Sequence, residues 1–283
     1  MGLFSREKTV SLRAYAKINL TLGVTGRRAD GYHTLDSLMT TVDLADDVKV
    51  ERDRDIVVTA TGMTLPYRNT MRMAAEAYHA LTGRGAIIHV YKHIPAEAGL
   101  GGGSADAAAV LLAMNRIYEE LDQVELARIA VQVGADVPFC LKGGLCRARG
   151  IGEELEALPI GRPLDLVLCK PAEGVSTKAL FTSLTLPCPQ PDQVSAIRAL
   201  AAGDIHLLSG SLVNSLEEPA VALVPAIGRL REALLSAGAI GARMTGSGST
   251  VFGIFESREA AERAAEAVRT HPDCAFCTVA RTI

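Results

Sequence analysis

A glycine-rich stretch at residues 94–109 carries the clearest chemical signal in the chain. It places four glycines within five residues and then changes to alanines and leucines. Glycines adopt left-handed conformations that side chains disfavour, and a helix beginning near Ser104 would add unpaired N–H groups and a positive dipole end. Such a loop predicts an anion site, most often for phosphate. A plain turn between a strand and a packed helix is the alternative.

Lys17 and Asn19 are a second group of residues that could do chemistry. Residues 10–24 place apolar side chains at every even position and polar, aromatic or small residues at every odd position, which predicts a long half-buried strand. Both residues therefore project from one face, about 6.6 Å apart along the strand. A solvated sheet face is the alternative, but Tyr15 and Thr21 flank the pair and favour a lined groove.

Asp136 is the candidate general base. It lies in Gly-Ala-Asp-Val-Pro at residues 134–138, between a predicted helix end and a proline, which favours an extended backbone. A carboxylate held by such a loop among apolar residues could take a proton from a reacting group. An Asx-turn that only closes the helix is the alternative.

Two further loops could bind ligands. Residues 25–34 turn at an Asp-Gly pair and present Tyr32 and His33, which could stack on and hydrogen-bond a planar base. Tyr32 could instead anchor the loop to the core. Residues 245–249, Thr-Gly-Ser-Gly-Ser, form a second small and flexible loop before an apolar strand, and a plain turn is the alternative there.

The remaining pattern predicts the elements that must position these residues. After the first strand, we expect strands over residues 38–50 (one or two, with an acidic turn at Asp46 and Asp47), 86–94, 164–169 and 275–280, and helices over residues 70–81, 104–118, 122–133, 192–203, 225–238 and 259–269. Asn69 is well placed as the N-cap of the first helix, and Asp122 and Glu125 have capping-box spacing. Lys92 lies near the glycine-rich stretch.

Length and composition predict a globular chain of two domains. Proline and glycine at residues 159–163 mark the boundary, which gives domains over residues 1–160 and 161–283. With 22% charged residues and a net charge of −3, the chain has no basic field for nucleic acid and no polybasic membrane patch. Residues 1–8 lack the apolar core of a signal peptide, and no apolar run reaches the roughly 18 residues of a membrane span.

The six cysteines predict free thiols in the cytoplasm. They are scattered, and the single C-x-x-C, at Cys274 and Cys277, has no second pair that would complete a zinc site. His89 and His93 could share a face, but they lack a third candidate ligand and are interpreted as ordinary sheet histidines.

Three separated motifs resemble the signatures of the GHMP kinases, the superfamily of galactokinase and of homoserine, mevalonate and phosphomevalonate kinases. They are Ala-Tyr-Ala-Lys-Ile-Asn-Leu at residues 14–20, the glycine-rich stretch at 94–108 and the loop at 245–249. The resemblance runs from about residue 14 to residue 255. It implies an α+β, two-domain fold with an N-terminal ribosomal-protein-S5-domain-2-like domain, a C-terminal ferredoxin-like α/β sandwich and the active site in the cleft between them.

Two more motifs are similar to one branch of this superfamily, which acts in the non-mevalonate isoprenoid route. They are Arg-Ala-Asp-Gly-Tyr-His at residues 28–33 and Gly-Ala-Asp-Val-Pro at residues 134–138. This resemblance implies an ATP- and Mg²⁺-dependent kinase that phosphorylates the 2-hydroxyl of diphosphocytidyl methylerythritol, a small-molecule substrate with a cytidine diphosphate moiety. We expect a monomer or weak homodimer that binds neither nucleic acid nor membrane.

The resemblance also implies a role for each candidate residue. Asp136 would take the hydroxyl proton or only orient the hydroxyl, and Lys17 would orient the hydroxyl or Asp136 and offset developing charge. The substrate would be held by Asn19, Tyr32, His33, Asp136 and Phe181, with the aromatic rings against the cytosine. ATP would be held by Asn69 and Lys92 near the adenine and by Pro95, Ala98, Gly99, Leu100, Gly101, Gly102, Gly103 and Ser104 at the phosphates, with Ser104 as the candidate metal ligand.

Two segments depart from the family pattern. Glu97 places an acid close to the proposed triphosphate site, and we expect its side chain to point outward. Residues 145–150 differ in their small residues but keep an Arg-Gly step.

Other functions fit the sequence less well. The Tyr32 and His33 loop argues against a mevalonate-pathway or homoserine kinase. A dinucleotide-binding oxidoreductase needs G-x-G-x-x-G, whose third glycine would fall at Ser104, and no Walker G-x-x-x-x-G-K-[ST] exists. A non-catalytic sensor on the same fold would not need both Lys17 and Asp136.

Overall fold

The computed structural model describes residues 7–283. Residues 1–6, on which most of the expected absence of a signal peptide depends, lie outside this described part. The chain divides into two compact units, each discontinuous in sequence. Unit 1 comprises residues up to 16 with 44–94 and 101–142, and unit 2 comprises residues 17–43, 95–100 and 143–283. The domain boundary expected after residue 160 stays a prediction. No helix within residues 7–283 is long and apolar enough to cross a membrane.

Two long strands contribute residues to both units. They are β1 (Thr9–Arg27) and β2 (His33–Asp53), and they pair with each other. The predicted alternation of β1 is confirmed over residues 10–15, where the even positions are buried more deeply than the odd positions beside them. From residue 16 to residue 24 its odd positions are buried as well, so this part of the strand has no solvated face.

The acidic turn expected within β2 is wrong. The strand continues through Asp46 and Asp47 without a break. Asp46 is completely buried, and its carboxylate accepts hydrogen bonds from the backbone N–H groups of His93, at 2.5 Å, and Ile94, at 2.8 Å. These donors stabilise the buried carboxylate, which water would hydrate if it lay in a surface turn.

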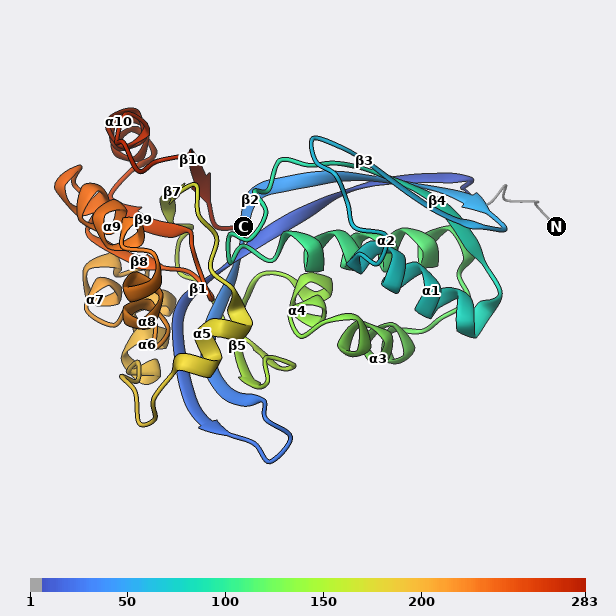
Figure 1. Cartoon of the computed structure of the whole chain (residues 1–283), viewed down its shortest axis with the longest axis horizontal. Coiled ribbons are helices and arrows are strands. Elements are labelled where there is room, and N and C mark those ends of the chain that lie inside the picture. Colours follow the sequence, from blue (N-terminus) through green and yellow to red (C-terminus); the bar gives the residue numbers. More distant parts are fainter. Residues whose placement is uncertain (1–6) are drawn as a thin grey trace. The chain divides into compact units, whose positions relative to one another are not determined.

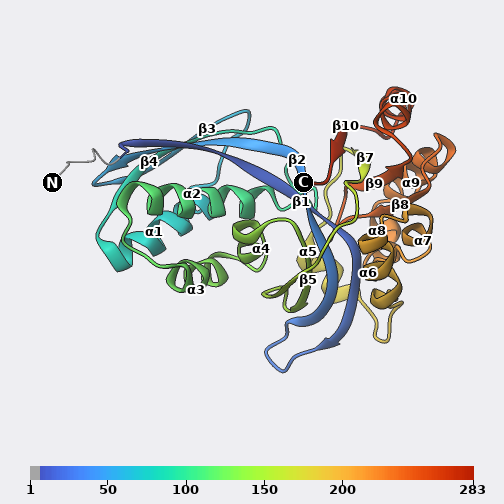
Figure 2. The same cartoon turned by 180° about the vertical axis from the view of Figure 1, so that it is seen from behind.

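Unit 1 packs helices against a small sheet. Its elements besides the two shared strands are β3 (Ile56–Thr61), α1 (Thr70–Thr82), β4 (Gly85–Tyr91), α2 (Gly102–Tyr118), α3 (Gln123–Val133) and α4 (Val137–Lys142). β4 pairs antiparallel with β2 and parallel with β3. Both views show the helices on one face of these strands (Figures 1 and 2). Alanines of α1 and α2 lie in one buried core, because small side chains let the two helices approach closely.

The predicted helix ends of unit 1 are confirmed at α1 and α3. The Asn69 side chain accepts a hydrogen bond from the backbone N–H of Arg72 at 3.0 Å, and Gly83 ends α1 in the left-handed conformation, with φ at 69°. Asp122 and Glu125 form a reciprocal capping box at the start of α3. These ends depend on neighbouring residues alone, which explains why the sequence predicts them.

Two features of unit 1 differ from the prediction. Helix α2 begins at Gly102, two residues before the expected Ser104, because the preceding glycine takes the left-handed conformation and starts the helix inside the glycine run. Helix α4 was not predicted. Gly134 accepts a hydrogen bond from the Val137 N–H at 3.1 Å, so Asp136 lies in a turn rather than in an extended segment.

Unit 2 contains the ferredoxin-like arrangement that the resemblance implied. Its elements are β5 (Leu145–Gly150), β6 (Glu154–Ala157), β7 (Asp165–Lys170), α5 (Thr177–Ser183), α6 (Gln193–Ala202), α7 (Ile205–Ser209), α8 (Glu217–Leu223), α9 (Ala226–Ser236), β8 (Gly241–Met244), β9 (Val251–Phe255), α10 (Arg258–Arg269) and β10 (Phe276–Arg281). The antiparallel sheet has the order β10-β7-β9-β8, and α9 and α10 pack on its strands (Figure 1). The order β7-α9-β8-β9-α10-β10 is therefore β-α-β-β-α-β, with α5 to α8 inserted after β7. The first part of β2 pairs with β5, and β5 pairs with β6.

Candidate active site

In unit 2, one stretch of β1 binds two glycine loops. The backbone N–H of Lys17 donates to the carbonyl of Leu100 at 3.0 Å, and the backbone N–H of Asn19 donates to the Thr245 hydroxyl at 2.7 Å. The segment at residues 95–100 and the loop at residues 245–249 thus meet at the strand position that carries Lys17 and Asn19. Three motifs that lie far apart in the sequence form one structural cluster.

The close contact of these two loops requires glycine. Gly99 has φ at 70°, and a Cβ atom on it would lie 2.4 Å from the Thr245 carbonyl oxygen. A Cβ atom on Gly246 would lie 3.2 Å from Lys17 Nζ and 3.3 Å from Asn19 Oδ1. A side chain at either glycine would separate the loops or displace the lysine. The loop at residues 245–249 is therefore more than a plain turn.

Lys17 and Asn19 lie inside the protein rather than on a solvated face. Lys17 is 4% exposed and Asn19 is 5% exposed, and Lys17 Nζ donates to Asn19 Oδ1 at 2.8 Å. The alternative of a solvated sheet face is therefore wrong, and the lined groove stays a prediction. A buried ammonium that faces an amide oxygen can orient an oxygen-bearing substrate and offset negative charge.

Sequence reasoning missed a residue that shapes this cluster. Asn214, also buried, donates from Nδ2 to the backbone carbonyls of Met244 at 2.8 Å and Gly246 at 2.9 Å. These two hydrogen bonds hold the backbone on both sides of Thr245, where the second loop begins. A single asparagine in an irregular segment has no spacing pattern, so no sequence signal points to it.

The loop between β1 and β2 presents Tyr32 to solvent. The side chain of Asp30 accepts a hydrogen bond from the Tyr32 N–H at 3.1 Å, and the Tyr32 carbonyl accepts one from the Arg28 N–H at 2.7 Å, which together close the turn. Tyr32 is 62% exposed, so it does not anchor the loop to the core. Its ring is accessible to a ligand.

His33 and Phe181 lie against each other in unit 2. Their ring centroids are 5.0 Å apart and the planes are inclined by 27°, which is a stacked arrangement. Phe181 belongs to α5, so the structure brings together two predicted base-binding residues that are far apart in sequence. Burial is the main cause that lowers the pKa of His33 below its usual value of 6.5, and the Arg27 guanidinium lowers it further. The imidazole is therefore mainly neutral at pH 7.

In unit 1, the start of α2 offers backbone donors. Gly101 has φ at 68° and provides no side chain to cap the helix. The first N–H groups of a helix have no acceptor within the helix, so those of Gly102, Gly103 and Ser104 suit an anion. The Thr70 hydroxyl donates to the Gly103 carbonyl at 2.6 Å and ties this first turn to α1.

Ser104 also neighbours the loop that carries Asp136. A Cβ atom on Gly134 would lie 4.0 Å from Ser104 Oγ, so the hydroxyl lies close to Gly134, where this loop begins. Among residues 7–283, no three His, Cys, Asp or Glu side chains form a cluster that could hold a metal. Mg²⁺ in kinases is held by substrate phosphates and only one or two protein oxygens, and the Ser104 hydroxyl is chemically suited to be one of them.

Lys92, expected near the adenine, belongs to a buried ionic cluster in unit 1. Its Nζ donates hydrogen bonds to the carboxylates of Asp46 and Asp106, the latter at 2.7 Å. Burial, and then repulsion by Asp46, raise the pKa of Asp106 to about 7, although the Lys92 charge opposes the shift. A Cβ atom on Gly102 would lie 3.5 Å from Lys92 Nζ, so this cluster lies beside the start of α2. Lys92 therefore helps to hold the start of α2 in place, whether or not it also binds near the adenine.

Glu97 is exposed, as expected, and lies against another loop of unit 2. A Cβ atom on Gly174 would meet Glu97 Oε2 at 2.5 Å. Glu97 is one of two non-glycine residues with positive φ, at 50°, among those that the structure describes. Its charge also acts on Lys170, whose pKa burial lowers and Glu97 raises.

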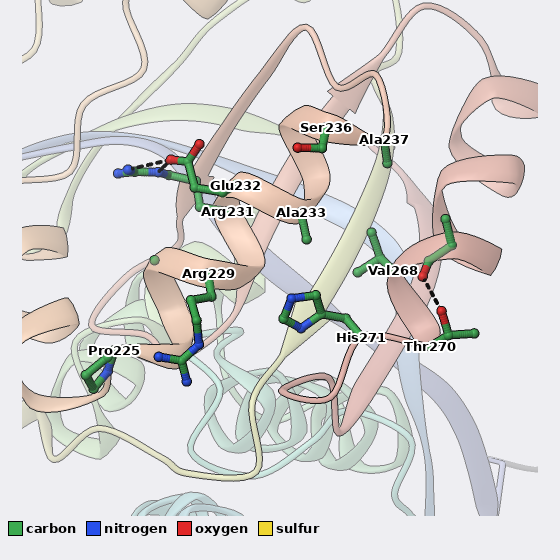
Figure 3. A pocket seen from close by; sticks show the side chains of 12 residues that line it. Pro225, Arg229, Arg231, Glu232, Ala233, Ser236, Ala237, Val268, Thr270 and His271 are labelled. Atoms are coloured by element: carbon green, nitrogen blue, oxygen red, sulfur yellow. Dashed lines mark hydrogen bonds and ion pairs between the residues drawn. The ribbon is translucent and has the colours of Figure 1, made fainter.

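A groove of about 850 Å³ between α9 and α10 lies apart from these residues within unit 2. Its lining includes Arg229, Ala233, Val268 and His271 (Figure 3). Two hydrogen bonds, of 2.6 and 2.8 Å, pair the Arg229 guanidinium with Asp273. None of the predicted site residues lines this groove, so it is not part of the candidate active site.

Comparison with known proteins places this geometry in a family. The family described as GHMP kinases N terminal domain matches residues 67–144, and GHMP kinases C terminal matches residues 196–274. These are ATP-dependent kinases. A 4-diphosphocytidyl-2-C-methyl-D-erythritol kinase of Desulfitobacterium hafniense is 42% identical over 262 residues, which cover 90% of each chain. One of Cereibacter sphaeroides is 43% identical and covers 92% of this chain and 94% of its own.

Solved structures agree with the sequence comparison. A crystal structure of 4-(cytidine 5'-diphospho)-2C-methyl-D-erythritol kinase matches with a TM-score of 0.83 and 36% identity over 96% of this chain and 99% of that one. Homoserine kinase from Cytophaga hutchinsonii shares the fold, with a TM-score of 0.79 over 100% of this chain and 97% of that one, at 22% identity. The α+β GHMP kinase fold expected from the sequence is confirmed, and the chain belongs to the 4-diphosphocytidyl-2-C-methyl-D-erythritol kinases of the GHMP kinase superfamily.

Proposed function

We propose that this protein transfers the γ-phosphoryl group of ATP to the 2-hydroxyl of 4-diphosphocytidyl-2-C-methyl-D-erythritol, in the non-mevalonate route to isoprenoid precursors. The observation that carries the proposal is the 38–43% identity to curated kinases of that name over about nine-tenths of the chain. The exposed Tyr32 and the stacked His33 and Phe181 support the choice of a substrate with an aromatic base.

The phosphate donor is bound by the glycine-rich stretch. The segment at residues 95–100, including Pro95 and Ala98, and the first turn of α2 to Ser104 surround the phosphates, which the backbone N–H groups of that turn receive. Asn69 and Lys92 lie near the adenine. The Ser104 hydroxyl contributes to binding Mg²⁺, which when bound neutralises charge on the transferring phosphoryl group.

The acceptor is bound by residues of unit 2. Tyr32 and Phe181 stack on the cytosine, while His33 stays neutral and hydrogen-bonds its edge. Asn19 holds the acceptor beside Lys17. Because phosphoryl transfer needs mainly positioning and charge stabilisation, these contacts place the 2-hydroxyl for attack rather than activate it strongly.

The chemistry is assigned to two side chains. The Asp136 carboxylate accepts the proton of the 2-hydroxyl as the oxygen attacks the γ-phosphorus, and Lys17 donates hydrogen bonds that orient the hydroxyl and offset developing negative charge. The burial of Lys17 and its hydrogen bond to Asn19 support this role, since a fixed cation in a dry site stabilises charge without reorganising.

The proposal extends to organisation and location. A domain boundary between residues 160 and 161 is supported by the two matched families, whose segments end at residue 144 and begin at residue 196. We place the enzyme in the cytoplasm, as a monomer or weak homodimer that works on a small molecule and engages neither nucleic acid nor membrane.

An ADP-release assay tests the substrate assignment. The protein is supplied with ATP, Mg²⁺ and either the diphosphocytidyl substrate, mevalonate or homoserine, and ADP formation is followed with a coupled reaction. Turnover of the first acceptor alone is expected, because only it carries a cytosine for the loop that holds Tyr32 and His33. Turnover of mevalonate or homoserine without turnover of the diphosphocytidyl substrate would reject the assignment.

The binding of cytosine should depend on pH through His33. Because its pKa lies below the usual value, the imidazole is mainly neutral between about pH 7 and pH 8 and gains charge as the pH falls through that lowered pKa. The KM for the diphosphocytidyl substrate should therefore be constant in the first range and rise below it. In His33→Gln, which hydrogen-bonds but does not titrate, the acid rise should disappear. An acid rise of equal size in the variant would contradict the role of His33, and the KM for ATP measured in parallel is the control.

A further inference from the structure

We propose that Ser37 is a positioning residue for the reaction, which fixes the amide of Asn19 and, through it, the ammonium of Lys17. The inference rests on the proposed function, because it assigns Ser37 to the acceptor side of that site. Ser37 is buried, with 2% of its surface exposed, and it lies on β2 opposite the strand that carries the other two residues. It therefore acts through Asn19 and not by touching substrate.

The hydrogen bonds run in one direction from the lysine. Lys17 Nζ donates to Asn19 Oδ1 at 2.8 Å, and Asn19 Nδ2 donates to Ser37 Oγ at 2.7 Å. The Ser37 hydroxyl in turn donates to the backbone carbonyl of Thr21 at 2.6 Å. Each donor polarises the next acceptor, so the series strengthens the contact of the amide oxygen with the lysine.

This direction decides which way the Asn19 amide faces. An ammonium carries only donors, so Lys17 is satisfied by the amide oxygen and repelled by the amide N–H₂ group. The Ser37 hydroxyl uses its hydrogen on Thr21 and is left with lone pairs, which accept from Nδ2 and not from Oδ1. Without this acceptor, the amide could rotate and turn its donors toward the lysine.

Ser37 is itself held by contacts on both sides. The neighbouring Asp36 accepts two hydrogen bonds from the Arg147 guanidinium, at 2.9 and 2.6 Å. Gln193 Nε2 donates to the Asp36 carbonyl at 2.8 Å, and Gln193 Oε1 accepts from the Thr21 hydroxyl at 2.8 Å. Thr21, whose carbonyl accepts from the Ser37 hydroxyl, and the adjacent Asp36 are therefore both held in a partly buried polar network.

The backbone of Asn19 is fixed independently of Ser37. Its N–H donates to the Thr245 hydroxyl at 2.7 Å, and the backbone N–H of Lys17 donates to the Leu100 carbonyl at 3.0 Å. Loss of the Ser37 hydroxyl should therefore change the orientation of one amide and leave the strand in place. The consequence should be a slower chemical step rather than unfolding.

The first test compares three variants. Ser37→Ala removes the acceptor, and kcat should fall about three- to tenfold, the effect of one net hydrogen bond, while the KM for ATP stays unchanged. Ser37→Thr keeps a hydroxyl and should restore most of kcat. Thr40→Val is the matched control, because it removes another buried hydroxyl from β2, which within residues 7–283 bonds only its neighbour's carbonyl, at 3.5 Å, and it should keep wild-type kcat.

The second test measures hydrogen exchange in the wild-type protein and needs a variant only to assign one signal. The side-chain N–H₂ signal of Asn19, assigned by its loss in Asn19→Asp, should exchange with solvent far more slowly than that of the exposed Gln132. Exchange as fast as that of Gln132 would overturn the role of Ser37. So would unchanged kcat in Ser37→Ala, or an equal loss in Ser37→Thr or Thr40→Val.

A parallel Lys17→Met variant separates this inference from the proposed function. If Lys17→Met is inactive and Ser37→Ala is fully active, only the positioning role fails. If Lys17→Met is fully active, the catalytic role of Lys17 fails and the inference fails with it.

Discussion

Replacing Asp136 by asparagine should lower kcat by about 10²–10⁴-fold, the usual contribution of a general base. The amide keeps the size of the side chain and can still accept a hydrogen bond, but it does not take up the hydroxyl proton. The dissociation constant for ATP should stay within about twofold of the wild-type value, because Asp136 contacts the acceptor and not the nucleotide. Single-turnover rates and ATP titrations measure the two effects separately.

Comparison with alanine separates the two roles that remain open for Asp136. If the carboxylate takes the proton, Asp136→Asn and Asp136→Ala should be similarly slow. If it only orients the hydroxyl, the asparagine variant should retain most of the activity and the alanine variant should not. Asp55→Asn, which changes an exposed carboxylate in the same unit, is the control. A near-normal kcat in Asp136→Ala would exclude both roles.

Replacing Lys17 by methionine should lower kcat by about 10²–10³-fold, the range measured when a preorganised donor to developing charge is removed. Methionine keeps a long side chain in the same space but carries no charge and no donor. Because Lys17 is 4% exposed, solvent does not replace its hydrogen bonds easily. The KM for ATP should change little compared with kcat, since the lysine acts on the reacting hydroxyl.

Two measurements keep this prediction specific. Lys178→Met removes an exposed lysine from α5 of the same unit, and its kcat should equal that of the wild type. A thermal melt of Lys17→Met checks that the protein remains folded, which we expect because removing a buried charge relieves its desolvation cost. If the folded variant turned over at the wild-type rate, Lys17 would have no part in the chemical step.

The sequence predicted the parts of the site that depend on neighbouring residues. Left-handed glycines before α2, the alternation of β1 and the caps of α1 and α3 are local signals, because a few adjacent residues set each backbone conformation. Sequence patterns also singled out Lys17, Asn19 and Asp136. The missed helix α4 and the false acidic turn show the limit of these signals, since Asp46 looks like a surface residue until its buried partners are known.

Only the tertiary structure decided what holds these residues in place. Asn19 contacts Ser37, 18 positions away, through its side chain and Thr245, 226 positions away, through its backbone, and no pattern in one sequence specifies such pairs. The same is true of the stacking of His33 on Phe181 and of the carboxylates around Lys92. Local chemistry therefore determined which residues could react, and long-range packing decided which buried polar groups orient them. A hydrogen bond between residues far apart in the sequence forms only where the folded chain brings them together.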